Sequence, residues 1–172
     1  MRKPRLKQST YSMMVVAMLV CLAMVLSIIE SFIPLSFVVP GIKLGLANLV
    51  VLCGIYVLSF KQALMLAVLK CVMTAWIFGS FPAFLYSIVG TMLSFFVMWV
   101  LVRGKVGTIA VSCVGAVCHN LGQIAVAALI IGSINVLYYL PVLIVLGALA
   151  GLLIGLCVKA VMPYVKRQWD HG

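Results

Sequence analysis

Acidic side chains are almost absent from this sequence. Glu30 and Asp170 are the two carboxylates among 172 residues. Two carboxylates cannot form an acidic cage for magnesium diphosphate or a paired general acid and base. The sequence also has no G-x-x-x-x-G-K-[ST] loop for ATP hydrolysis. These absences exclude most enzyme classes, and we expect a protein without catalytic activity.

Cysteine and histidine are also too scattered to form a recognisable cofactor site. The six cysteines lie inside apolar runs and form no C-x-x-C pair, so they indicate neither a disulfide framework nor a zinc site. The two histidines, His119 and His171, are poorly spaced for haem ligation. We therefore expect no metal and no cofactor, and we interpret the cysteines as small packing residues.

Apolar side chains, by contrast, make up most of the chain. Hydrophobic residues account for 66% of it and charged residues for 8%, which is more apolar surface than a soluble domain of this size can bury. The formal net charge is +10, but the basic residues mostly lie between apolar runs, as in cytoplasmic loops of membrane proteins. This pattern predicts a multi-pass membrane protein in contact with lipid and does not favour nucleic-acid binding.

The apolar runs can be divided into membrane spans, each of which needs about 20 mainly apolar residues. Charges and clusters of Gly, Pro, Ser and Asn separate six predicted spans, at approximately 10–32, 43–60, 62–79, 83–102, 107–131 and 138–162. The last two come from one charge-free run, 106–158, which the GSIN turn at 132–135 divides. We predict an all-α protein with one six-helix transmembrane domain at 10–164, between a basic tail at 1–9 and a C-terminal tail at 165–172.

The orientation in the membrane follows from the positions of the basic clusters. They precede the first span, follow the last, and lie at Lys61 and at Arg103 with Lys105. Six crossings place all of these clusters on one side, and positive loops are cytoplasmic. The sequence therefore predicts that both termini are cytoplasmic.

Polar side chains within the spans are few, and they are costly in lipid unless they face a cavity or a partner. With a rise of about 1.5 Å per residue, Lys70 and His119 lie near the bilayer centre, and Asn48 lies about 7 Å below Lys43 at the outer surface. This distribution predicts a cavity open to the outside. The predicted substrate-binding residues are Glu30, Lys43, Asn48, Lys70, His119, Asn120 and Gln123.

Each of these residues also has a purely structural interpretation. Lys43 could extend its ammonium group to the membrane interface. Lys70 could form a buried ion pair with Glu30. Asn48 and the His119-Asn120 pair could hydrogen-bond neighbouring helices together.

Small residues provide a separate signal for helix packing. Gly147, Gly151 and Gly155 form a double G-x-x-x-G sequence in the last span. This spacing lets two helices approach closely, and close packing is what joins helices in lipid. We predict that these three glycines lie at a helix interface.

Four sequences together resemble a known family. They are PGIKLGLANLVVL (40–52), ALMLAVLK (63–70), GSFPAFLYSIVGTMLSF (79–95) and AVCHNLGQIAVA (116–127). They resemble the Gx transporter family of small bacterial membrane proteins, formerly labelled "heptaprenyl diphosphate synthase component I", over about 12–164. The resemblance implies a location in the bacterial cell membrane. A prenyl diphosphate synthase needs aspartate-rich magnesium motifs, which this sequence lacks.

That family is similar to the substrate-binding S-components of energy-coupling factor (ECF) transporters. The similarity implies a six-helix bundle with an outward pocket formed by the loop between spans 1 and 2 and by later helices. It also implies two kinds of partner, a membrane coupling subunit and cytoplasmic ATPase subunits. Such S-components often contact the coupling subunit through an A-x-x-x-A sequence on the first helix, and the nearest match here is Ala17-x-x-x-Cys21.

The leading prediction is a subunit that captures a small micronutrient or cofactor precursor from outside for ATP-driven import. Two lysines with little nearby acid favour a ligand with an apolar or aromatic body and an anionic or carbonyl group. One alternative is an accessory protein of a quinone or flavin electron-transfer pathway. Another is a non-catalytic subunit that binds lipid diphosphate while a second chain supplies the acidic residues.

Overall fold

The computed structural model describes residues 5–32, 45–78 and 81–171 of the chain, and these residues form helices joined by short connections. The elements are α1 (Arg5–Ser31), α2 (Leu46–Val57), α3 (Phe60–Phe78), α4 (Phe81–Arg103), α5 (Thr108–Ile131), the 3-10 helix η2 (Ile134–Tyr139) and α6 (Leu140–His171). The prediction of an all-α protein is confirmed.

Five of these helices, α1, α3, α4, α5 and α6, are long and apolar enough to cross a membrane. Helices suit lipid because each backbone N–H and C=O group is satisfied within the segment. Large apolar side chains also lie on the outer surface of the bundle: Met18 is 71% exposed and Leu129 is 82% exposed. Such a surface fits acyl chains, and it supports a multi-pass membrane protein.

Helix α2 differs from the other five because it is short. It has 12 residues, so it is about 18 Å long, whereas a bilayer core is about 30 Å thick. Most of the helix is buried, including Val50, Val51 and Leu52, and it contacts α1, α3, α4 and α6. The predicted span 43–60 thus corresponds to a short internal helix.

The chain turns where glycine and short polar residues predicted a break. Gly132 ends α5 with a φ of 66°, a left-handed conformation that glycine adopts without strain. The Ser133 side chain then accepts a hydrogen bond from the backbone N–H of Asn135 and begins η2. Two helices are longer than predicted, because α1 already begins at Arg5 and α6 continues to His171.

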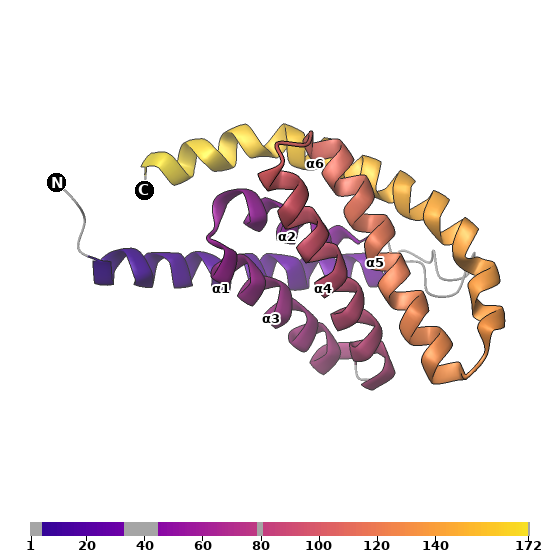
Figure 1. Cartoon of the computed structure of the whole chain (residues 1–172). Helices are drawn as coiled ribbons and strands as arrows, with labels where there is room; N and C mark the ends of the chain where they lie inside the picture. Colours follow the sequence, from indigo (N-terminus) through magenta and orange to yellow (C-terminus); the bar gives the residue numbers. More distant parts are fainter. Residues whose placement is uncertain (1–4, 33–44, 79–80, 172) are drawn as a thin grey trace.

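The described helix ends gather towards two ends of the bundle (Figure 1). The beginning of α1, the end of α6 and the α2–α3 turn lie towards the left of that view, with the α4–α5 connection at the top near its middle, and the end of α1, the beginning of α4 and η2 lie towards the right. We call the first of these the basic end, because Lys61, Arg103 and Lys105 lie at its connections.

Glycine brings α4 and α5 into backbone contact. A Cβ atom added at Gly122 would lie 2.7 Å from the Cα of Gly90, and one added at Gly90 would lie 2.7 Å from the carbonyl oxygen of His119. No larger residue fits at such distances without moving the backbone, so these glycines set the separation of the two helices.

The three glycines predicted to pack helices lie on the α5 side of α6. A Cβ added at Gly151 would lie 2.7 Å from the Cα of Cys113, and one at Gly155 would lie 2.8 Å from the Cα of Ile109. At Gly147 the nearest atom would be the side-chain nitrogen of Asn120. Helix α5 is therefore packed closely against α4 on one side and against α6 on the other. We call these three helices the α4–α6 layer.

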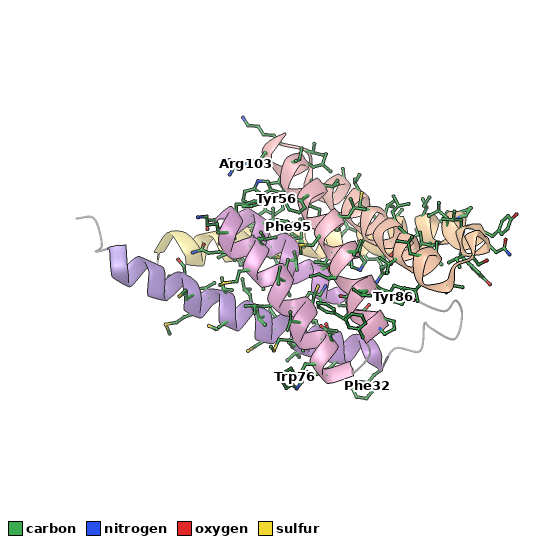
Figure 2. The ribbon with its side chains drawn as sticks, turned by 60° about the horizontal axis from the view of Figure 1, so that its bottom comes forward. Phe32, Tyr56, Trp76, Tyr86, Phe95 and Arg103 are labelled. Carbon is green, nitrogen blue, oxygen red and sulfur yellow. The ribbon has the colours of Figure 1, made fainter. Side chains whose placement is uncertain are left out.

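An aromatic cluster marks the basic end. The Phe60 and Trp99 rings are 5.0 Å apart in a T-shaped arrangement, and Phe95 beside them is fully buried. The Arg103 guanidinium carbon lies 5.0 Å from the Trp99 ring centroid, a cation–π distance. Figure 2 shows Arg103 and Phe95 towards one end of the bundle and Trp76 with Phe32 towards the other.

Candidate functional site

A cavity of about 30 Å³ lies between α2, α4, α5 and α6. Its polar side chains are Asn48, Ser94, Ser112, His119, Asn120 and Gln123, and its other lining residues are Gly45, Leu52, Met98, Gly115, Ala116, Gly147, Ala150 and Ile154. The volume suits about two water molecules. The cavity therefore combines hydrogen-bonding groups from three helices with an apolar remainder.

The beginning of α2 forms one edge of this cavity. Gly45, with a φ of 76°, precedes the helix, and its backbone N–H donates to Oε1 of Glu30 at 2.6 Å. The first N–H groups of a helix lack helical partners and carry partial positive charge, so a carboxylate there is stabilising. Glu30 was predicted to bind substrate, and the structure places it as a partner of the backbone that begins α2.

Lys70 lies behind Asn48 as seen from the cavity. Its Nζ donates to Oδ1 of Asn48 at 2.8 Å, and its side chain is 6% exposed. Asn48 lines the cavity and Lys70 is not among the lining residues. A buried ammonium group needs hydrogen-bond acceptors to offset the loss of water. The amide oxygen of Asn48 is one such acceptor.

Helix α5 contributes His119, Asn120 and Gln123 to the opposite wall. Asn120 Nδ2 donates to the backbone carbonyl of Leu143 on α6 at 2.9 Å. His119 and Gln123 lie beside Gly90, where an added Cβ would be 3.2 Å from His119 Cε1 and 3.0 Å from Gln123 Cγ. The absence of a side chain at residue 90 thus leaves room for both residues.

Two buried hydroxyl residues of the cavity were missed by sequence reasoning. Ser94 on α4 and Ser112 on α5 are 3% and 4% exposed, and both line the cavity. Ser87, Thr91 and Ser94 follow one another at i, i+4 and i+7, which places them on one face of α4. That spacing was a usable signal, although serine and threonine are common in membrane helices and attract little notice individually.

The remaining predicted residues lie away from the cavity or outside the described part of the chain. Lys43 lies outside the described residues. Ala17 and Cys21, predicted to contact a partner, are both exposed on α1. The structure therefore brings together Asn48, His119, Asn120 and Gln123 around one cavity, while their role in binding substrate stays a prediction.

The donor groups present do not fit a magnesium diphosphate site. Among the residues that the structure describes, no three His, Cys, Asp or Glu side chains come together. The Glu30 carboxylate is already engaged with the backbone of Gly45. Magnesium bound to diphosphate normally needs carboxylate oxygens. This chain alone does not provide them in its described part, and we derive no metal-dependent step.

Comparison with known proteins gives one match to a family. Residues 19–161 match the family model described as "Heptaprenyl diphosphate synthase component I". No curated protein and no solved structure matches the chain. The match confirms the older family label contained in the resemblance, while the similarity to ECF S-components stays a prediction. Because the match covers most of its length, the chain belongs to the heptaprenyl diphosphate synthase component I family.

Proposed function

We propose that this protein is a non-catalytic membrane subunit that captures a small micronutrient or cofactor precursor for import, similar in role to an ECF S-component. The observation that carries the proposal is the meeting of Asn48, His119, Asn120 and Gln123 at one cavity inside an apolar bundle. Polar side chains are costly at membrane depth, and their convergence from separate helices is typical of a binding site.

The position of the cavity supports capture from the side opposite the basic end. Tyr56, near the end of α2, donates a hydrogen bond to Oγ1 of Thr108 at the beginning of α5 at 3.2 Å. Asn48 is eight residues earlier in α2, about 12 Å away along the helix axis. The Asn48 edge of the cavity thus lies well inside the bundle from the basic end, which the charge pattern predicts to be cytoplasmic, while Ser112 at the other edge lies one turn after Thr108.

The proposal requires the cavity to widen. A volume of about 30 Å³ holds water, whereas pockets for small molecules usually enclose about 300–1,000 Å³. The α4–α6 layer is fixed by backbone contacts at its glycines. We therefore propose that α2 moves away from this layer when a ligand enters, which would separate Asn48 from the α5 wall.

Import would also require partners that supply energy. The sequence has no phosphate-binding loop for ATP, so we propose a membrane coupling subunit and cytoplasmic ATPase subunits. The exposed Ala17 and Cys21 on α1 form a small-residue surface where a partner helix could approach closely.

The family description supports a second candidate. The chain could serve as a non-catalytic subunit for prenyl diphosphate metabolism, with the diphosphate held by its cations and the acidic residues provided by another chain. The shortage of carboxylates agrees with that division of roles.

Mass spectrometry of small molecules that copurify with the full chain in lipid nanodiscs tests these functions. Ala150 lines the cavity, so Ala150→Phe fills it, and Ala160→Phe places the same ring on the exposed side of α6. We expect a compound enriched over empty nanodiscs in the wild type and in Ala160→Phe, and reduced at least about tenfold in Ala150→Phe. An isoprenoid diphosphate in the extract would favour the second candidate. Absence of any enriched compound, or equal retention by Ala150→Phe, would contradict a binding role.

A further inference from the structure

We infer that the cavity binds an uncharged ring that presents a carbonyl group to α2 and an N–H group to α5, as the different edges of a cyclic imide do. This inference rests on the proposed binding function and narrows its substrate class. Two lysines in the sequence favoured an anionic or carbonyl group on the ligand, and this inference keeps the carbonyl group and leaves out the anionic one.

The charges around the cavity argue against an ionic ligand. The described residues that line the cavity include no Lys, Arg, Asp or Glu. His119 is the titratable side chain among them. Lys70 is separated from the cavity by the Asn48 amide, and the Glu30 carboxylate lies against the backbone of Gly45 at the cavity edge. One positive and one negative group on the same side offset each other. Among the described residues that line the cavity, an ionic ligand would find no direct counter-charge to offset the hydration it loses, which is unfavourable.

The Asn48 amide has an orientation that chemistry fixes. A protonated lysine can donate but cannot accept hydrogen bonds, so the oxygen of Asn48 must face Lys70. The Nδ2 group then lies on the side of Gly45, where an added Cβ would be 3.1 Å from it. Lys70 also draws electron density from the amide and strengthens its N–H groups as donors. Asn48 therefore offers the cavity a hydrogen-bond donor.

The side-chain amide of Asn120 has the opposite orientation, with its nitrogen toward its hydrogen-bond partner. The carbonyl of Leu143 can only accept, so the nitrogen of Asn120 must face it. The side-chain oxygen of Asn120 is then the group available to a ligand. The two amides thus offer a donor from α2 and an acceptor from α5 on facing walls of the cavity. A ring with a C=O group on one edge and an N–H group on another complements both.

The amides of Asn48 and Asn120 can both keep their orientations when the cavity widens to admit a ligand. The Asn48–Lys70 hydrogen bond joins α2 to α3, and the Asn120–Leu143 hydrogen bond joins α5 to α6. Neither of them crosses the cavity. A movement of α2 away from the α4–α6 layer can therefore enlarge the space while each amide keeps its partner. Leu52, Met98 and Ile154 would supply apolar contacts for a flat ring.

Three uracil derivatives test the ligand class. Uracil is uncharged and carries C=O and N–H groups on several edges, 1,3-dimethyluracil lacks the N–H donors, and orotate adds a carboxylate to the same ring. Binding to the full chain in nanodiscs is measured by saturation-transfer NMR, with empty nanodiscs as the blank. We expect saturable uracil binding and at least about tenfold weaker binding of the other two. Equal binding of all three, preference for orotate or 1,3-dimethyluracil, or absence of uracil binding would overturn the inference.

A matched pair of variants tests the role of Asn48. Asn48→Asp keeps an oxygen for Lys70 but replaces the N–H donor with a second acceptor. Asn135→Asp makes the same change at an exposed residue of η2. We expect uracil affinity to fall at least about tenfold in Asn48→Asp and to stay unchanged in Asn135→Asp, with thermal unfolding recorded for both variants. Unchanged affinity in Asn48→Asp would overturn the inference.

The two proposals fail in distinguishable ways. A copurified anion that is lost in Ala150→Phe, without uracil binding, would leave the binding function in place and overturn the amide inference. Absence of both copurified ligand and uracil binding would overturn the two together.

Discussion

The two halves of this bundle are held together by different means. In the α4–α6 layer, glycines bring helix backbones into direct contact, as at Gly122 with Gly90 and at Gly151 with Cys113. In the α1–α3 half, partly buried polar contacts join the elements, as between Glu30 and Gly45 and between Asn48 and Lys70. The comparison shows one wall of the cavity set by backbone contact and the other set by side chains.

This difference assigns separate roles to the two walls. Close backbone packing has little tolerance for displacement, because any shift opens gaps or creates clashes. The short helix α2 contacts the layer less extensively than α4 and α6 contact α5, and it carries Asn48 on its first turn. The α4–α6 layer therefore supplies the fixed wall of the cavity, and α2 supplies the movable one.

The largest expected effect comes from breaking the fixed wall. Gly151→Ala places a methyl group about where the backbone of Cys113 already lies, at 2.7 Å, so we expect a loss of about 2–3 kcal/mol in the free energy of unfolding. Gly107→Ala is the control, because an added Cβ there meets nothing within 4 Å. Unfolding of both variants in detergent would be measured, and equal stability would show that the glycine contacts do not fix the layer.

A smaller effect is expected on the movable wall. Asn48→Leu removes an acceptor from a buried ammonium group and should cost about 1.5–2 kcal/mol, whereas Lys70→Met leaves one amide oxygen without its donor and should cost about 1 kcal/mol. The double variant should cost less than the sum of the two. Unfolding free energies of the two single variants and the double variant give the coupling. Strict additivity would show that the two side chains act independently.

The smallest effect is expected where the two halves meet at the basic end. Tyr56→Phe removes the hydrogen bond to Thr108, whose donor–acceptor distance is 3.2 Å, and we expect a loss of about 0.5–1 kcal/mol. Phe95→Leu, within the buried aromatic cluster, would serve as a comparison with a larger expected loss. A Tyr56→Phe effect greater than that of Phe95→Leu would mean that the hydrogen bond, and not ring packing, joins the halves there.

Much of the helical layout could be predicted from the sequence. Long apolar runs broken at charges predicted the long helices closely, and the break at 132–135 lies where Gly132 adopts its positive φ. The glycine triplet of α6 was recognisable because its spacing repeats every four residues, which is one helix face. The short length of α2 was not evident, because no charge interrupts the apolar run between Lys43 and Lys61.

The candidate site could be predicted in part. Asn48, His119, Asn120 and Gln123 stood out because amides and imidazole are costly in lipid. The position of Lys70 behind Asn48 and that of Glu30 against Gly45 depend on how α1, α2 and α3 pack together, which no local pattern contains. Ser94 and Ser112 escaped notice because a hydroxyl group can satisfy itself on its own helix backbone.

The order of synthesis gives the contact between Asn48 and Lys70 a further consequence. Helices α2 and α3 leave the ribosome before α5 and α6 exist, so the later wall cannot shield the polar groups of α2 when they first enter the membrane. A lysine and an asparagine only 22 residues apart can satisfy each other within a single helical hairpin. That early pairing would keep the hairpin soluble in lipid until the C-terminal helices arrive and enclose it.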